Sequence, residues 1–104
     1  MKILHILAQF PGETGSGIYV NALINEGKKR NHQQGLIAAI QDGLTYENDS
    51  LEYLNLVRFN TEGIPFNIVG MSDIMPYPST KYKELNKKML STWMNAFEKS
   101  IIDA

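Results

Sequence analysis

Residues 3–17 read ILHILAQFPGETGSG, an apolar run that leads into a loop with three glycines. Positions 17–30 then carry apolar residues at helical spacing, and a second apolar run follows at 35–40. A strand, a glycine-rich loop, a helix and a parallel strand in this order form a βαβ unit, and its loop lies where the backbone can approach a phosphate or a sugar. We therefore expect an α/β fold: a Rossmann-like, three-layer arrangement with a small, mostly parallel sheet.

The apolar pattern also predicts the remaining elements. The first strand should be buried on both faces, because its apolar run is nearly continuous rather than alternating. Gly27 lowers helix propensity, so it indicates close packing of the first helix against the sheet. The expected elements are strands at 2–8, 35–40 and 54–59, an extended piece at 64–69, a loop at 70–80, and helices at 17–30 and from 81 to the end.

Three helix caps can be predicted from residue type. Ser16 is the expected N-cap of the first helix, and Asn31 can adopt the left-handed conformation that ends it. Ser79 or Thr80 is the expected N-cap of the second helix, with Glu84 close enough to assist.

Composition excludes several classes of protein. The 104 residues suffice for one small domain. Ten basic and eleven acidic residues give a net charge of −1, so nothing favours a nucleic acid or an anionic membrane as partner. The absence of cysteine excludes disulfides and thiolate metal sites. We expect a cytoplasmic protein without a transmembrane segment, since no run approaches the roughly 20 apolar residues that a span needs.

The glycine loop is the best candidate site. Gly12, Gly15, Ser16 and Gly17 place small residues before a helix, where free N–H groups favour an anionic or hydroxylated ligand. The alternative is that these glycines only allow the tight turn out of the strand, and the residues alone leave it open.

Two nucleotide-binding motifs resemble this loop, and neither fits. Gly12 and Gly17 have the spacing of a Walker A loop, but Ile-Tyr follows where that loop needs Lys and then Ser or Thr, which excludes such an ATPase. Val20 replaces the third glycine of the dinucleotide fingerprint, so a nucleotide-dependent oxidoreductase is disfavoured. Asp42 after the second strand is a weak signal for a ribose ligand.

The other candidate side chains are few. His5 and His32 are more typical of packing or capping residues than of catalysts. No His, Asp or Glu spacing suits a metal, so we expect neither metal nor cofactor. Ser72 and Asp73 lie in the proline-containing loop after the strands, where α/β domains bind ligands, and they are candidate acceptor-side contacts. The alternative is that Asp73 only stabilises the turn.

Several segments together resemble the opening of the family 4 glycosyltransferases of the GT-B fold. In that family a strand runs into a Pro-x-x-Gly-Gly type of loop, and the helix commonly closes with Arg-Gly-His. Here Ser16 separates the two glycines, and Asn31 replaces the glycine of the closing motif. The residues that carry the resemblance are 1–7, 10–11, 15–17, Leu23, 29–32 and the longer block 64–80.

The resemblance implies transfer of a sugar from a nucleotide-sugar to an acceptor, with retention at the anomeric carbon and usually without a bound metal. It implies that residues 1–104 are part of the N-terminal, acceptor-side domain, whose glycine loop approaches the donor diphosphate. The nucleotide-sugar domain lies outside this sequence, so we expect the chain to be inactive alone. Catalytic residues, donor, acceptor and pathway stay unassigned, and peripheral membrane association of the full-length enzyme is an alternative location.

A rival interpretation is a small stand-alone, non-catalytic α/β module that binds a ligand or regulates a partner. The gene sequence beyond Ala104 separates the two, since a transferase must continue into a second α/β domain. Association is the last expectation. An open edge on the first strand and an uncovered part of the apolar stripe Tyr82–Ile101 would favour a dimer or higher oligomer.

Overall fold

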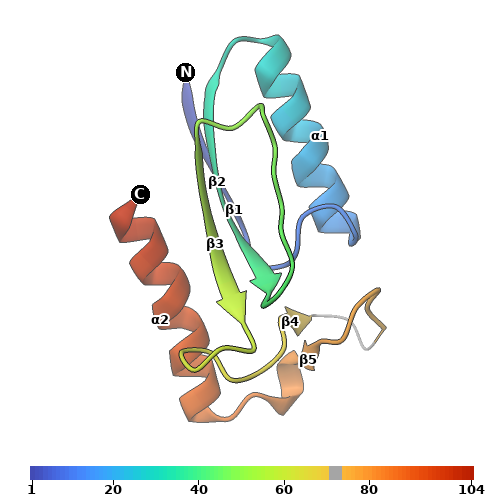
Figure 1. Cartoon of the computed structure of the whole chain (residues 1–104), viewed down its shortest axis with the longest axis vertical. Helices are drawn as coiled ribbons and strands as arrows, with labels where there is room; N and C mark the ends of the chain where they lie inside the picture. Colours follow the sequence, from blue (N-terminus) through green and yellow to red (C-terminus); the bar gives the residue numbers. More distant parts are fainter. Residues whose placement is uncertain (71–73) are drawn as a thin grey trace.

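The computed structural model describes residues 1–70 and 74–104. Three parallel strands form the main sheet in the order β1-β2-β3, as Figure 1 shows. Their bounds are Lys2–Leu7, Gln33–Gln41 and Tyr53–Phe59. The predicted strands are thereby confirmed, the second one longer than expected.

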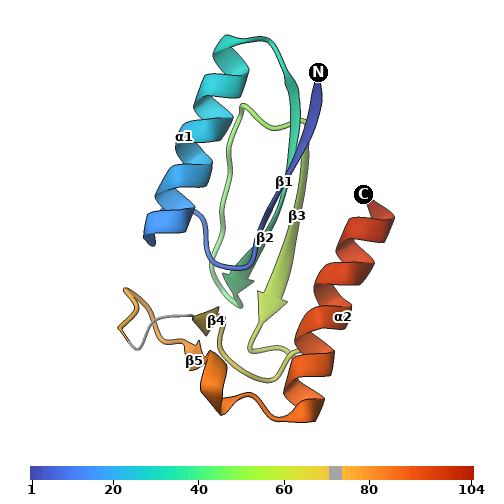
Figure 2. The ribbon, with the colours of Figure 1, turned by 180° about the vertical axis from the view of Figure 1, so that it is seen from behind.

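The two long helices, α1 (Gly15–Lys29) and α2 (Lys87–Asp103), lie on opposite faces of this sheet (Figures 1 and 2). The connection between β2 and β3 runs along the α1 face, where the Tyr46 hydroxyl donates to Asn21 Oδ1 at 2.7 Å. The arrangement is the expected α/β fold with helix, sheet and helix layers.

The second helix begins later than predicted. Thr80–Lys81 forms a short strand, β5, which pairs in parallel with β4 (Val69–Gly70). Because this pairing keeps residues 80 and 81 extended, no α-helix can start there. A 3₁₀ turn, η1 (Tyr82–Glu84), follows, and α2 starts only after Asn86, whose side chain accepts from Met89 N at 2.8 Å. The prediction that Ser79 or Thr80 caps this helix is therefore wrong.

The first helix ends as expected but starts differently. Thr14 is its N-cap, with Oγ1 accepting from Gly17 N at 3.0 Å, so the assignment of this cap to Ser16 is wrong. Asn31 has φ +59°, which confirms the left-handed residue at the C-terminal end. Asn31 N donates to Lys28 O and His32 N to Gly27 O, the bond pattern of a Schellman cap.

Burial differs between the two strands that begin the βαβ unit. Residues 34–40 of β2 are buried, because helices cover both faces of this central strand. β1 lies at the edge of the sheet, and Leu4 and Ile6 on its α2 side are 39% and 50% exposed. The prediction that the first strand is buried on both faces is wrong, since a continuous apolar run does not reveal a strand's position within the sheet.

The apolar core has one part on each face. The part beneath α1 is small and includes Ile24 of the helix and Leu36 of β2. The part on the α2 face is larger, because residues 64–69 fold over the ends of β2 and β3 and add to it, with Tyr77 and Leu85 packed against them. Its buried members are Ile37, Ala39, Val57, Phe59, Ile64, Ile68 and Val69.

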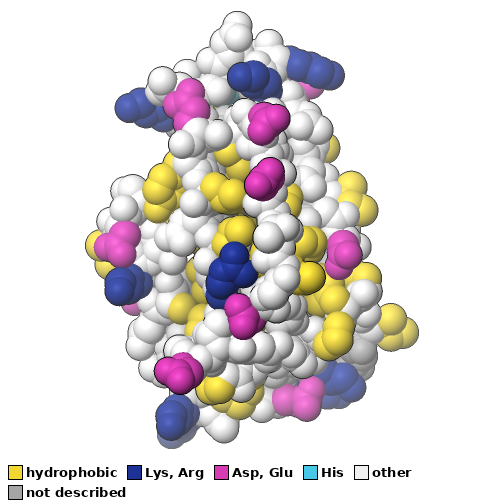
Figure 3. Space-filling view, viewed as in Figure 1, with side chains coloured by type: hydrophobic (Ala, Val, Ile, Leu, Met, Phe, Trp, Pro, Cys, Tyr) yellow, Lys and Arg dark blue, Asp and Glu magenta, His cyan; other side chains and the backbone are white. Residues whose placement is uncertain are grey.

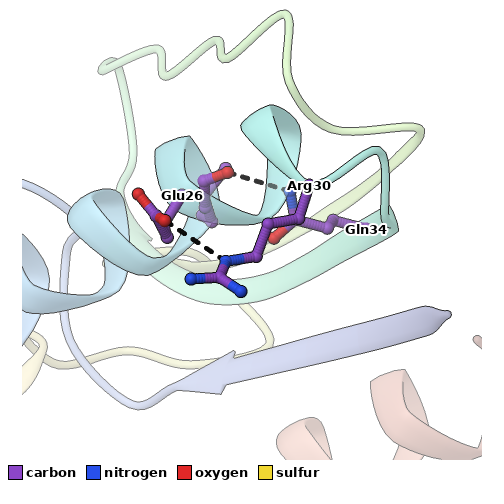
Figure 4. A network of polar contacts seen from close by, with 4 residues as sticks. Glu26, Arg30 and Gln34 are labelled. Carbon is purple, nitrogen blue, oxygen red and sulfur yellow. Dashed lines mark hydrogen bonds and ion pairs between the residues drawn. The ribbon is translucent and has the colours of Figure 1, made fainter.

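The helix glycine packs against the sheet as predicted. A Cβ on Gly27 would collide with the side chain of Gln34, which is 2% exposed. Two hydrogen bonds hold the Gln34 amide there. Its Nε2 donates to Ile24 O at 2.9 Å, and its Oε1 lies 2.9 Å from His5 Nε2. Figure 4 shows this amide beneath the helix, with the exposed Glu26–Arg30 ion pair on the outside.

Candidate functional site

The glycine loop connects β1 to α1 at the carboxyl ends of the parallel strands, as Figure 1 shows. Gly12 has φ +109°, in the region that only glycine adopts readily, so the turn itself requires this residue. The edge where the loop lies is the one at which open α/β sheets bind their ligands.

The other two glycines of the loop have different surroundings. A Cβ on Gly17 would come 2.5 Å from Gly12 N and 2.7 Å from Phe10 O, so the loop leaves no room for a side chain there. A Cβ on Gly15 would meet no atom within 4 Å. Packing within the loop therefore explains why residue 17 is a glycine. Gly15, in contrast, faces open space where a ligand can approach.

Polar groups converge around Gly15. The Ser16 hydroxyl donates to Gln9 Oε1 at 3.0 Å and lies 3.2 Å from Thr14 Oγ1. The N–H groups of Gly15 and Ser16 belong to the first turn of α1, where a helix offers no carbonyl to accept from them. The loop thus combines backbone donors with hydroxyl and amide groups.

These groups border an open hollow of about 470 Å³. The volume is in the range of small-molecule sites. Glu13 is one of its lining residues, and the negative charge of Glu13 opposes a phosphate inside the hollow and suits a neutral hydroxylated ligand. The hollow is lined by Gln9, Glu13, Thr14, Gly15, Ser16, Ile74, Met75 and Pro76.

Tyr77 holds residues 74–78 against the glycine loop. Its hydroxyl accepts from Phe10 N at 3.4 Å, and the two rings meet edge to face with centroids 6.4 Å apart. The pKa of Tyr77 is raised above its usual value, mainly because the side chain is partly buried. The hydrogen bond from Phe10 lowers it, and the nearby charge of Glu13 raises it. Sequence analysis missed Tyr77, for which the flanking prolines Pro76 and Pro78 are the only available signal.

A second set of contacts secures the same edge of the sheet. Asn60, with φ +61°, donates through Nδ2 to Gln41 Oε1 and to Asn67 Oδ1, both at 2.8 Å. Gln41 Nε2 in turn donates to Pro78 O at 2.9 Å. The loops that follow β2 and β3 are therefore tied to the segment that borders the hollow.

The remaining sequence candidates contribute little to this site. His5 contacts Gln34 under α1, and His32 takes part in the cap of that helix. Asp42 is exposed, and its N–H donates to Phe59 O. Ser72 and Asp73 lie outside the residues that the structure describes.

The described part of the chain offers neither a metal site nor a helix that could span a membrane. Within residues 1–70 and 74–104, no three His, Asp or Glu side chains gather in a way that would hold a metal ion. No described helix has the length and apolar character to cross a membrane. Basic and acidic side chains are mixed over the face that Figure 3 shows.

Comparisons with family models, with curated proteins and with solved structures find no match to this chain. What is established is thus a small α/β fold with a parallel three-stranded sheet.

Proposed function

We propose that this chain is the acceptor-side part of a retaining glycosyltransferase that uses a nucleotide-sugar donor. The observation that carries the proposal is the hollow beside Gly15, which opens at the carboxyl edge of the parallel sheet between the glycine loop and residues 74–76. The resemblance of the glycine loop and of residues 64–80 to family 4 glycosyltransferases supports the same assignment.

The chemistry of the hollow suits a sugar acceptor. The Gln9 amide, the Ser16 hydroxyl and the Glu13 carboxylate can exchange hydrogen bonds with sugar hydroxyls. Ile74, Met75 and Pro76 provide an apolar wall for the C–H face of a sugar ring. We assign the hollow to the neutral acceptor, because the Glu13 charge would repel a diphosphate placed in it.

A binding experiment on the chain tests this assignment. In amide NMR spectra, titration with methyl glycosides and short oligosaccharides should shift the Gly15 and Ser16 signals, with dissociation constants on the order of millimolar, as expected for an open site. Calorimetry with UDP-, GDP- and ADP-sugars should show no heat of binding, because the donor site is proposed to lie mainly outside these residues.

Two variants make the titration specific. Gly15→Val should abolish the shift of the Ser16 signal, because the valine side chain would fill the space that the ligand needs. The chain should stay folded, because a Cβ at position 15 meets no atom within 4 Å. Gly63→Ala, whose added Cβ meets only Thr61 Oγ1 at 3.9 Å, should bind as the wild type does. Glycosides that leave the loop signals unmoved, or micromolar binding of a nucleotide-sugar, would refute the assignment. An open reading frame that continues beyond Ala104 into a second α/β domain would support the transferase over the stand-alone module.

A further inference from the structure

A chain of hydrogen bonds runs through the glycine loop and ends at Gln9. Gly17 N donates to Thr14 Oγ1 at 3.0 Å, and Thr14 Oγ1 lies 3.2 Å from Ser16 Oγ. Ser16 Oγ in turn donates to Gln9 Oε1 at 3.0 Å. We call these four residues the relay.

The chemistry of its members fixes the direction of the relay. A backbone N–H only donates, and the side-chain oxygen of Gln9 only accepts, so it takes the single hydroxyl proton of Ser16. The Thr14 proton then goes to Ser16 Oγ, and every proton of the relay is paired. A Gln9 amide turned the other way would leave one hydroxyl proton without an acceptor in the relay.

The relay therefore leaves Gln9 Nε2 as a donor for a ligand. This NH₂ group forms no hydrogen bond with residues 1–70 or 74–104, and Gln9 lines the hollow. The backbone of Gln9 is also held, because Ala39 N donates to Gln9 O at 3.2 Å. Gln9 thus presents a donor, and not an acceptor, at a fixed place in the wall of the hollow.

The opposite polarity and an apolar surface come from other lining residues. Glu13 forms no ion pair with a described residue, and its carboxylate can only accept hydrogen bonds. Its charge raises the pKa of Tyr77, so the carboxylate lies toward the segment that carries the apolar wall. The wall itself consists of Ile74, Met75 and Pro76. A ligand that fills the hollow therefore meets a fixed donor, a fixed acceptor and an apolar surface.

We propose that the hollow takes an acceptor sugar that carries an acetamido group, an inference that rests on the proposed acceptor site. The carbonyl oxygen of this group only accepts and suits Gln9 Nε2, whereas its N–H only donates and suits the Glu13 carboxylate. Its methyl group suits the apolar wall at residues 74–76. A hydroxyl in the same place has one polar atom and no methyl group, so it satisfies only part of the site.

Paired probes test this substrate class. They are methyl 2-acetamido-2-deoxyhexosides of the gluco, galacto and manno series and the matching methyl hexosides, which differ from them only at C2. In amide NMR titrations the best acetamido glycoside should bind at least about fivefold more tightly than its partner. It should shift the side-chain NH₂ signals of Gln9 and leave those of Gln33, at the amino end of β2, in place.

A variant of Gln9 tests whether its donor makes the selection. Gln9→Glu keeps an oxygen that accepts from Ser16 but replaces the NH₂ group by a second acceptor. It should raise the dissociation constant of the acetamido glycoside at least about tenfold, because a carbonyl cannot donate to a carboxylate. The matching hexoside should lose no more than about threefold, since a hydroxyl can turn to donate. Gln33→Glu, the same change at an exposed position, should alter neither value.

Ser16 is a positioning residue that acts through Gln9. Ser16→Ala should weaken binding of the acetamido glycoside about threefold in the wild-type chain. In Gln9→Leu, which has no amide left to orient, the same change should have no further effect. Losses that multiply in the double variant would show that Ser16 contacts the ligand itself and would overturn the relay.

The outcomes separate this inference from the proposed function. Acetamido glycosides that bind no better than their partners, or an equal loss of both in Gln9→Glu, would overturn the inference while the sugar site stands. Glycosides of both kinds that leave the Gly15 and Ser16 signals in place would overturn the proposed acceptor site, and the inference with it.

Discussion

The two helices cover opposite faces of one sheet, but they are buried to different degrees. α1 contains three buried residues, Gly17, Ile24 and Gly27, whereas none of residues 87–103 in α2 is buried. The difference does not follow from the apolar pattern, since the stripe along α2 is at least as regular. Two of the three buried residues of α1 are glycines, which let its backbone approach the loop and β2 closely. α2 instead packs through its own large side chains Trp93 and Phe97, which remain partly exposed.

Helical periodicity therefore shows which side of a helix packs against the sheet, but not how closely the helix packs. Small residues at the contact indicate close approach, because nothing else lets two backbones come together. A helix held by large side chains keeps part of its stripe in solvent, and Met94 is 59% exposed in this way.

The largest expected effect comes from filling the close approach at the start of α1. Gly17→Val should lower the free energy of unfolding by about 3 kcal/mol or more, because its Cβ would collide with two backbone atoms that cannot move separately. Gly15→Val, two residues earlier, should change it by no more than about 0.5 kcal/mol. Urea unfolding followed by circular dichroism measures both. Equal losses for the two variants would show that the loop is looser than its geometry implies.

A smaller loss is expected where α1 packs on β2. Gly27→Ala should cost about 1–3 kcal/mol, because the added methyl group must displace the buried Gln34 amide. The double variant Gly27→Ala/Gln34→Ala should lose less than the sum of the two single changes, since removing the amide makes room for the methyl group. Chemical unfolding of all three variants gives the coupling. Strict additivity would mean that Gln34 does not limit the approach of the helix.

The smallest effects compare the helix caps. Thr14→Ala should cost about 1–2 kcal/mol, because its bond to Gly17 N is buried, and Asn86→Ala about 0.5–1 kcal/mol, because its bond to Met89 N is exposed. Ser16→Ala should cost only a few tenths of a kcal/mol, since its hydroxyl bonds side chains near the surface. Thermal unfolding ranks the three. A loss at Ser16 as large as that at Thr14 would return the cap to Ser16.

Errors in the predicted elements have a common origin in long-range contacts. Helical periodicity from residue 81 predicts that the second helix starts there, but pairing of Thr80–Lys81 with Val69–Gly70 keeps residues 80 and 81 extended. The Asn86 side chain then supplies the cap. A one-dimensional pattern contains no information on a strand of two residues whose partner is a distant segment.

Only part of the candidate site could be predicted, because the rest of it also depends on long-range contacts. The position of the glycine loop before α1 and the left-handed Asn31 follow from local chemistry and could be predicted. The different roles of Gly15 and Gly17 could not, because they depend on where the loop backbone returns over the helix. The contact of Tyr77 with Phe10, across 67 positions of the chain, gave no local signal either.

The sequence by itself determined the order of the three main strands and two long helices, the parallel βαβ unit and the place of its loop, because apolar periodicity and turn chemistry act over a few residues. Only the tertiary structure decided that β2 rather than β1 is the buried strand, that Thr14 caps α1, and that residues 74–76 close one side of the hollow. Each of these depends on which distant segments share a surface. Such contacts are set by the burial of the whole chain and not by any one segment of it.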